Sequence, residues 1–331
     1  EKETRPFLRS REFLWQEGHT IHETIKEARE RTLQMLEVYA DVVENLLAIP
    51  VIKGIKTETE KFAGAEYTYT VEALMYNGVA LQSGTSHYFG DNFAKPFNMT
   101  YLDRENKLRY VYQTSWGLST RIIGALIMTH GDDHGLVLPP NIAPIKVNII
   151  PIGKNTEVLD KSYEIAKELK LANISCEVDD SDKTPGFKFA ESEVNGTPIR
   201  IEIGKRDLEN NHVTLVRRDT LEKIVVPFEE ILPKVKELLA TIQSDMFKRA
   251  KARRDSMIYD AKTYDELREI ATTKDGGFIK INWCGNESCE NKIKDDFGIK
   301  SRCLIDDEEV TGPCTVCGGK ATTRLYIGRQ Y

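Results

Sequence analysis

The sequence lacks the features that would indicate a membrane or secreted protein. No apolar run approaches the ~18 residues that span a bilayer. The first residues, Glu-Lys-Glu-Thr-Arg, do not resemble a signal peptide. The six cysteines are unevenly spaced and most lie near the C-terminus, so they indicate a metal site rather than a disulfide scaffold. We therefore expect a protein of the reducing cytoplasm with no membrane partner.

An excess of basic residues is also missing. The formal net charge of −6 argues against a protein that coats nucleic acid nonspecifically, although it is compatible with a local basic patch for a folded RNA. The 331 residues, 40% hydrophobic and 30% charged, are typical of a soluble globular chain with two or three domains. The chain begins without Met and in a charged segment, and we interpret it as a truncated product.

The first informative stretch, residues 5–19, has the alternation of a β-strand. Side chains of a strand point to opposite faces in turn, so the odd-numbered residues share one face: Arg9, Arg11, Phe13, Trp15, Glu17 and His19. Burying such a face without partners would cost several kcal/mol per charge. The pattern indicates either a solvated strand face or the floor of a site for an anionic nucleotide and a small zwitterion.

Periodicity divides the chain into three domains. Residues 1–143 combine strands and turns with a long amphipathic helix that follows the capping pattern Thr20-x-x-Glu23, and they predict an antiparallel sheet with helices, an α+β fold. Residues 144–255 alternate strands with helices and predict an α/β domain. Residues 256–331 hold a short helix and a Cys-rich region, and they predict a small α/β domain.

The α/β domain has clear local signals. We expect strands and helices over these segments: 147–152, 156–171, 175–178, 213–217, 224–226 and 228–254. Asn195-Gly196 lies between two alternating segments and predicts a hairpin turn. The basic end of the last helix, residues 247–254, is either a solvated helix face or an RNA contact.

Three polar segments of the first domain carry candidate chemistry: residues 59–66, 82–88 and 115–121. Each signal is weak alone, and the Gly-Thr-Ser-His of the second is compatible with an ordinary turn. Together they supply what carboxylate activation by ATP needs: cations for phosphates, an aromatic plate for adenine and a small pocket for the acid. No Ser-His-Asp order or Cys nucleophile is apparent.

Two close Cys pairs, Cys284-x4-Cys289 and Cys314-x2-Cys317, have the spacing of a structural tetrahedral zinc site. Four unrelated thiols are the alternative, and Cys303 could replace one ligand. Cys176 is expected to be a buried strand residue. In the second domain, Arg200 and Glu202 share one strand face with Glu193 across the expected hairpin. This set predicts either a surface salt-bridge ladder, which would contribute little stability, or a surface that reads RNA bases.

Several of these segments resemble prolyl-tRNA synthetases, which are class II aminoacyl-tRNA synthetases. Arg9-Ser-Arg-Glu-Phe13 resembles the second half of class II motif 2, and the following Leu-Trp-Gln-Glu-Gly-His resembles its prolyl-specific continuation. Gly117–Arg121 resembles motif 3. The paired cysteines and the terminal Tyr331 resemble the archaeal/eukaryotic type, in which the terminal carboxylate folds back toward the active site. Motif 1 and the first motif 2 Arg are absent, which bears on dimerisation and full activity.

This resemblance implies a proline–tRNA ligase with an antiparallel-sheet catalytic domain, an α/β anticodon-binding domain and a zinc-binding domain. It implies ATP, Mg²⁺, structural zinc, proline and tRNA(Pro) as ligands and a homodimer as the full-length assembly. It implies that Arg9 and Arg121 hold phosphates, that Phe13 stacks on adenine and that Gln82 borders the nucleotide. The remaining roles fall on the proline pocket (Trp15, Glu17, His19, Phe62, Thr85, His87 and Ser115) and the anticodon guanines (Glu193, Arg200 and Arg206). The alternatives are a class II enzyme for another amino acid and a non-catalytic homologue that acts as a tRNA- or protein-binding regulator.

Overall fold

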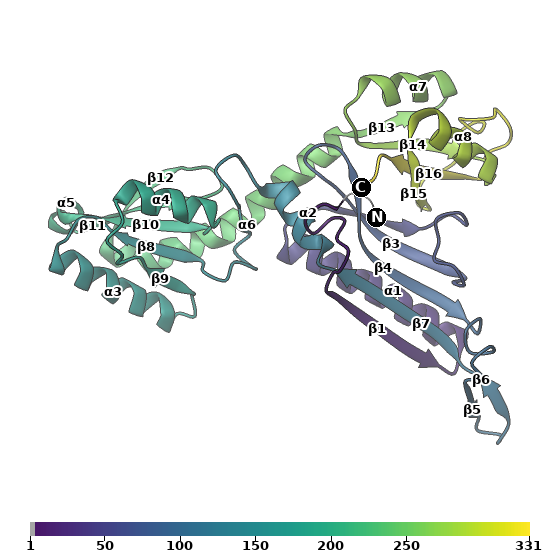
Figure 1. Ribbon diagram of the computed structural model, residues 1–331, viewed down its shortest axis with the longest axis horizontal. Coiled ribbons are helices and arrows are strands. Elements are labelled where there is room, and N and C mark those ends of the chain that lie inside the picture. The colour runs from purple at the N-terminus through teal and green to yellow at the C-terminus, as the bar shows by residue number, and fades with distance from the viewer. Residues whose placement is uncertain (1–3) are drawn as a thin grey trace. The chain divides into compact units, whose positions relative to one another are not determined.

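A computed structural model describes residues 4–331, and the chain divides into two compact units that are treated separately (Figure 1). The first unit holds the described residues up to 44 together with 49–129 and 251–331. The second unit holds residues 45–48 and 130–250. Within residues 4–331, no helix is both long enough and apolar enough to cross a membrane.

An antiparallel sheet forms the centre of the first unit. Its five strands, in the order β1-β7-β4-β3-β2, are β1 (Trp15–His22), β7 (Tyr112–Ser119), β4 (Ala80–Gly90), β3 (Tyr67–Leu74) and β2 (Val51–Ile55). A separate hairpin joins β5 (Thr100–Leu102) to β6 (Leu108–Tyr110), and α2 (Arg121–His130) follows β7. The expected antiparallel sheet with helices is confirmed.

Helix α1 (Ile25–Asp41), extended by a π-helical turn over Val42–Leu46, packs on this sheet through Ala28, Leu36 and Tyr39. Its capping box uses Thr24 and Glu27, so the prediction that placed it at Thr20 was wrong. Thr20 belongs to β1, and its Oγ1 lies 2.6 Å from Thr114 Oγ1 on β7. The same Thr-x-x-Glu pattern occurs twice, and pairing with β7 extends the strand past the first copy.

The expected strand face was only half right, because β1 begins at Trp15. Arg9, Arg11 and Phe13 precede it. Residues 5–9 form a loop that is closed by two backbone hydrogen bonds between Arg5 and Arg9 and turns at Phe7, whose φ is +59°, and Arg11 and Phe13 follow this loop outside any strand. Within β1, Trp15, Glu17 and His19 do share a face. Gly18 on the other face is required by packing, since a Cβ there would lie 2.2 Å from the Trp116 indole.

The C-terminal part of the first unit is a four-stranded sheet flanked by helices. The strand order is β13 (Ile258–Ala261), β14 (Phe278–Trp283), β16 (Thr323–Gly328) and β15 (Lys300–Ile305), with helices α7 (Tyr264–Thr273) and α8 (Glu287–Phe297). Sequence reasoning gave this region one short helix and located none of its strands.

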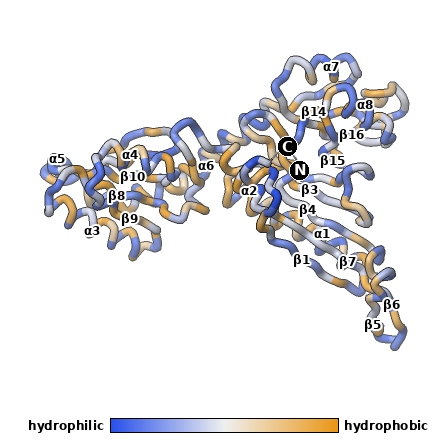
Figure 2. Tube along the Cα trace, in the orientation of Figure 1, coloured by the Kyte–Doolittle hydropathy of each residue, from blue (hydrophilic) through white to orange (hydrophobic). Residues whose placement is uncertain are grey.

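The second unit has a mixed sheet in the order β12-β11-β10-β8-β9. Its strands are β12 (Lys223–Pro227), β11 (His212–Arg217), β10 (Ile199–Ile203), β8 (Val147–Pro151) and β9 (Cys176–Val178), and β8 runs parallel to both β9 and β10. The helices are α3 (Thr156–Leu171), α4 (Pro185–Val194), α5 (Lys205–Glu209) and α6 (Ile231–Ser256), with a 3₁₀ turn at Phe228–Glu230. Figure 2 shows hydrophobic residues on β8 and β10 and a hydrophilic α5.

The hairpin predicted at Asn195-Gly196 was wrong, because the segment before it is helix α4. Asn195 is the C-cap of α4, and Gly196 has a φ of +71° just beyond it. A left-handed glycine is the usual end of a helix, and the same dipeptide also suits a two-residue hairpin. Glu193 therefore lies on a helix, and the chain passes from that helix directly into β10.

Candidate functional site

A cavity of about 570 Å³ lies on the first unit's large sheet. Its lining contains all seven side chains that were predicted to form a proline pocket and also Gln82. They come from β1, from the loop between β2 and β3, from β4 and from β7 and are Trp15, Glu17, His19, Phe62, Thr85, His87 and Ser115.

Strand register explains why residues so distant in the sequence meet. In one row across the sheet, His19 pairs with Ser115, Ser115 with His87, and His87 with Thr68. In the next row, Glu17 pairs with Gly117, and Gly117 with Thr85. Directly opposed residues of neighbouring strands point to the same face, so each row delivers its polar groups to one surface.

Gln82 reaches this surface through a β-bulge. Strand β4 pairs Gly84 with Val71 but Gln82 with Glu72, so one residue, Ser83, is extra. A bulge shifts the alternation by one position. Gln82 therefore shares a face with Thr85, although the two residues are three apart. The interpretation of residues 82–88 as an ordinary turn was wrong, because they form the centre of β4.

Aromatic rings form one wall of the cavity. Phe62 has ring contacts with His87 at 5.1 Å and with Phe89 at 5.8 Å, and Phe89 meets Phe93 at 4.9 Å. Sequence reasoning missed Phe89, Phe93 and Phe97, which also line the cavity. Phe89 could have been found because it continues the alternation of His87 on β4, whereas the other two lie in turns with no periodic signal.

His87 is the buried titratable group of the cavity. Burial lowers its pKa from 6.5 to about 4, so the imidazole is neutral at pH 7. Its Nδ1 lies 3.0 Å from Thr68 Oγ1, and that hydroxyl also accepts a hydrogen bond from the Phe62 backbone N–H. The hydroxyl can then donate its own hydrogen to Nδ1, which places the imidazole hydrogen on Nε2. A neutral ring suits a site for an uncharged, apolar side chain.

Glu17 and His19 lie at the exposed side of the cavity, where Glu17 Oε1 is 3.2 Å from His19 Nε2. Beneath them, on the face of α1, the Tyr39 hydroxyl donates to Gln16 Oε1 at 2.5 Å. Burial and the negative charge of Glu17 raise the pKa of Tyr39 to about 12. Among the residues that the structure describes, Glu17 and Glu60 are the two carboxylates that line the cavity and can accept hydrogen bonds from a small cation.

Three predicted ATP residues, Arg9, Phe13 and Arg121, are absent from the lining of this cavity. Phe13 borders a separate hollow of about 480 Å³ formed by the segment before β1 and by Thr120, and its ring meets the Trp15 ring at 6.1 Å. Arg121 is the first residue of α2, and Arg9 is exposed. The Phe13–Trp15 contact makes the two hollows neighbours.

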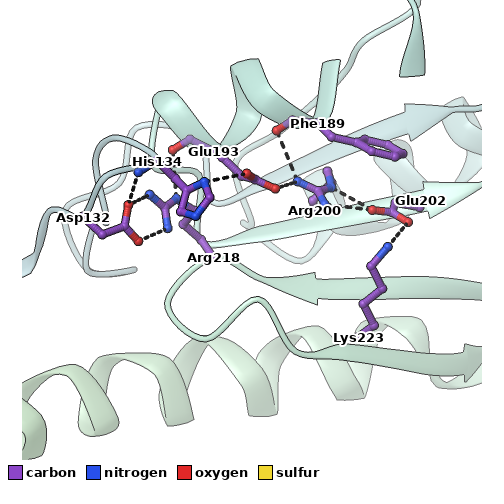
Figure 3. Close-up of polar contacts among 8 residues, drawn as sticks. All are labelled: Asp132, His134, Phe189, Glu193, Arg200, Glu202, Arg218 and Lys223. Carbon is purple, nitrogen blue, oxygen red and sulfur yellow. Dashed lines mark hydrogen bonds and ion pairs between the residues drawn. The ribbon is translucent and has the colours of Figure 1, made fainter. Parts of the chain in front are cut away.

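A buried charged cluster lies on β10 of the second unit (Figure 3). Arg200 donates to Glu193 Oε1 at 2.9 Å, to Glu202 Oε1 at 2.9 Å and to the Phe189 carbonyl at 3.2 Å. Its guanidinium also lies 4.5 Å from the centre of the Phe189 ring. Lys223 on β12 donates to Glu202 Oε2 at 3.2 Å. Because Arg200 and Glu202 are only 6% and 7% exposed, the alternative of a surface ladder was wrong.

Glu193 is also held from its other side. Arg218 donates to the Glu193 carbonyl at 2.8 Å and binds both oxygens of Asp132 at 2.6 and 2.8 Å. This pair holds the pKa of Asp132 below its usual range. His134 Nδ1 lies 3.8 Å from Glu193 Oε2 (Figure 3). Arg206, the third predicted reader, is exposed on α5, beyond the opposite end of β10 from Arg200.

Four cysteines meet in the C-terminal part of the first unit. The Sγ atoms of Cys284, Cys289, Cys314 and Cys317 all lie within 4.8 Å of one another. Two of the separations are 3.6 and 3.9 Å, and a tetrahedral site with Zn–S bonds of ~2.3 Å requires about 3.8 Å. The cluster could hold a metal ion. Cys303 lies outside it on β15, fully buried, and Cys176 is buried on β9 as expected.

The end of the chain joins the large sheet. Ala80 at the start of β4 forms a parallel bridge with Gln330, and Asn77 Nδ2 donates to the Tyr331 hydroxyl at 2.8 Å. The Arg5 guanidinium lies 5.9 Å from the centre of the Tyr331 ring. The C-terminus thus meets the segment that leads into β1.

Comparison with known families identifies the three domains. Residues 1–130 match the tRNA synthetase class II core domain (G, H, P, S and T), residues 146–238 match the anticodon binding domain, and residues 264–331 match the C-terminal domain of prolyl-tRNA synthetase. The proline–tRNA ligase of Lachnospira eligens is 58% identical over all of this chain, which spans 69% of that protein. The chain belongs to the prolyl-tRNA synthetase family.

Two further relatives agree. The proline–tRNA ligase of Clostridium novyi is 56% identical and proline–tRNA ligase 2 of Bacillus cereus is 52% identical, each over the whole of this chain and about 70% of its own length. Membership of the prolyl-tRNA synthetase family confirms the expected class II fold with an anticodon-binding and a C-terminal domain. The relatives named here are bacterial, so they support the family without specifying the archaeal/eukaryotic type.

Proposed function

We propose that the 570 Å³ cavity is the proline site of a proline–tRNA ligase, the activity that the family and its curated relatives assign to this chain. One observation carries the assignment: seven side chains chosen from the sequence for this role line a single cavity. The rings of Trp15 and Phe62 suit a pyrrolidine ring, and Glu17 can accept hydrogen bonds from its secondary ammonium.

The ligands ATP and Mg²⁺ belong to the same proposal. Arg9 and Arg121 would hold the phosphates, Phe13 would stack on adenine, and Gln82 would lie between the two substrates. The proline carboxylate attacks the α-phosphorus, a P–O bond forms, and the bond to pyrophosphate breaks. No side chain has to act as a nucleophile. Catalysis then consists of aligning the reacting atoms and of neutralising phosphate charge, to which Mg²⁺ contributes when bound.

The prolyl group would next pass to the terminal ribose of tRNA(Pro), whose anticodon guanines we assign to Glu193, Arg200 and Arg206. A carboxylate suits the N1–H and N2–H donors of guanine, and a guanidinium suits O6 and N7. The buried cluster places Glu193 and Arg200 2.9 Å apart. Arg206 lies on α5, outside this cluster.

The four clustered cysteines are proposed as a structural zinc site, which has no open position for a catalytic water. One zinc per chain is expected, and Cys314→Ser should release it and unfold the C-terminal part. Cys303→Ser is the matched control and should keep the zinc. Elemental analysis of the two purified variants decides between them, and equal zinc content in both would remove the proposed ligand set.

The remaining assignments are the domain limits, the enzyme type, the location and the assembly. We place the domains at 1–143, 144–255 and 256–331. The Cys-rich C-terminal part and the terminal Tyr331 favour the archaeal/eukaryotic type. A cytoplasmic location without a membrane partner and a homodimeric full-length enzyme complete the proposal.

Trp15→Ala in the intact enzyme tests the proline site. The variant should raise the KM for proline in ATP–pyrophosphate exchange more than tenfold and the KM for ATP much less, because the indole forms a wall of the cavity. Ile21→Ala, which shortens an exposed side chain of the same strand that lines neither hollow, is the control. Faster exchange with threonine, glycine or histidine than with proline would contradict the assignment.

A further inference from the structure

The loop of residues 56–66, which joins β2 to β3, forms one side of the cavity. Two of its residues, Glu60 and Phe62, line the cavity, although the loop has no strand or helix of its own. Its internal hydrogen bonds are few and local, such as those that the Thr57 carbonyl accepts from the backbone N–H groups of Glu60 and Lys61. The large sheet binds Phe62 itself, through its N–H on Thr68 Oγ1 and its ring contact with His87. The path of the residues that lead to Phe62 depends on what holds the loop from outside.

The C-terminal part of the same unit holds it at three points. Thr57 Oγ1 lies 3.2 Å from Ser301 Oγ of β15, and Lys300 Nζ lies 3.3 Å from Glu60 Oε1. Thr59 donates to Glu290 Oε2 of α8 at 2.9 Å. The three contacts involve Thr57, Thr59 and Glu60, which precede Phe62 in the loop. Together they fix the path of the backbone toward the cavity wall.

The start of the loop is fixed by a fully buried ion cluster. Lys56 forms an ion pair with Glu72 Oε1 of β3 at 2.9 Å, and Arg302 of β15 forms one with Glu72 Oε2 at 2.6 Å. All three side chains are at most 4% exposed. Removing one partner from such a cluster leaves an unpaired buried charge and costs several kcal/mol, so this end is rigid. The three contacts around Thr59 extend that rigid base toward the cavity.

Glu290 does more than fill space at this junction. It is 8% exposed, and its Oε1 has no hydrogen-bond donor among the residues that the structure describes. An apolar residue would cost less there, because a half-satisfied buried carboxylate destabilises the folded state. The other oxygen binds Thr59. Glu290 also follows Cys289, a member of the four-cysteine cluster, in the first turn of α8.

We propose that Glu290 and Lys300 are positioning residues for the amino-acid site, which they reach through Thr59 and Glu60. The C-terminal part thereby sets how closely Phe62 approaches the bound proline. This inference rests on the proposed assignment of the cavity to proline. It implies that proline binding responds to changes at Glu290 and Lys300 more strongly than ATP binding does.

The test combines Glu290→Met with Thr59→Val in the intact enzyme. Neither residue lines the cavity, and each substitute has about the size of the side chain that it replaces. Each single variant should raise the KM for proline in ATP–pyrophosphate exchange about tenfold, with kcat and the KM for ATP changed less than twofold. The double variant should be no worse than either single variant, because both remove the same contact.

Two further measurements separate positioning from general loosening. Glu290→Met should leave the melting temperature and the zinc content unchanged or raise the former, because it removes a half-satisfied buried charge. Weaker proline binding without lost stability is not expected of a residue with a merely structural role. Glu287→Met, in the same turn of α8 but exposed, is the matched control and should behave as the parent does.

Three outcomes would overturn the inference. An unchanged KM for proline in both single variants would show that the contact does not act on the cavity. A parallel rise of the KM values for proline and ATP with a lower melting temperature would show general loosening. If Trp15→Ala also leaves the KM for proline unchanged, the assignment of the cavity to proline fails. If Trp15→Ala raises this KM and the Glu290 and Thr59 variants do not, only the present inference fails.

Discussion

The cavity of the first unit and the charged cluster of the second unit, which we propose as the sites for proline and for guanine, are built by opposite physical means. The cavity presents aromatic rings and a neutral imidazole on strands whose register holds them in rows. The cluster presents charges that already neutralise one another, since Arg200 is bound by both Glu193 and Glu202. The aromatic wall of the cavity is preformed, and its charged lining residues Glu17 and Glu60 each have one ion-pair partner, whereas a base that binds the cluster would have to exchange hydrogen bonds with several buried charges.

This difference suits the two ligands. Proline offers little beyond a ring, a cation and a carboxylate, so a preformed pocket of the right shape gives most of the selection, and a missing methylene is worth only about 1–3 kcal/mol. A guanine edge offers donors and acceptors that match the internal partners of the cluster. If guanine binds here as we propose, its edge would take the place of some of these internal partners.

The largest expected effect comes from breaking the cluster. Arg200→Met should lower the free energy of unfolding of the second unit by about 3 kcal/mol, because Glu193 and Glu202 lose their shared partner. Arg206→Met, an exposed Arg of the same domain, is the control and should change it by less than 0.5 kcal/mol. Urea unfolding monitored by circular dichroism measures both. Equal stability of the two variants would mean that the cluster is not a coupled buried unit.

An intermediate effect should come from lowering the pH, which should destabilise the folded protein through His87 in the cavity. The folded-state pKa of His87 is about 4 and the unfolded value is 6.5, so the unfolded chain binds the extra proton first. The contribution of the neutral His87 ring to the free energy of unfolding is therefore fully present above pH 6.5 and is lost as the pH falls toward 4. His87→Gln should flatten this part of the stability profile. If the imidazole NMR signal assigned to His87 by its loss in His87→Gln titrates near pH 6.5 in the folded protein, the burial of His87 is contradicted.

The smallest effect should come from the exposed edge of the cluster. Lys223 is bound to Glu202, but its side chain is 58% exposed. Lys223→Met should therefore change the free energy of unfolding by less than about 1 kcal/mol, with a salt dependence weaker than that of the parent. A loss as large as that of Arg200→Met would mean that Glu202 relies on Lys223 more than on Arg200.

The cavity could be predicted from the sequence better than the cluster could. Trp15, Glu17 and His19 alternate on one strand, and period-2 alternation survives folding when the strand pairs along its whole length. Arg9 and Phe13 continue the same pattern but lie outside β1, because pairing with β7 begins at Trp15 and the chain bends at Arg11 and Glu12. No local signal announces where the pairing begins.

Glu193 and Arg200 were predicted as neighbours from the sequence, but the prediction that they lie on an exposed hairpin was wrong. The dipeptide Asn195-Gly196 ends helices and makes hairpins equally well, so it does not decide the structure before it. The signal that was overlooked is Pro185, which follows the N-cap Thr184 and opens the helix Pro185–Val194. Burial was the second error, since charges are expected at the surface unless partners are known. The partners Arg218 and Asp132 lie far from Glu193 in the sequence, and no spacing rule connects them.

The central claim is that amino-acid activation depends on the cavity and that tRNA recognition depends on the cluster. Glu193→Ala tests this claim most directly. The intact variant should charge tRNA(Pro) at least tenfold more slowly than the parent, and its penalty for substituted anticodon guanines should shrink, while proline-dependent pyrophosphate exchange stays nearly unchanged. Glu191→Ala on the same helix, where Glu191 pairs with exposed Lys183, is the control and should charge normally. Equal charging by the Glu193→Ala variant and the parent, or a parallel loss of exchange, would contradict the account.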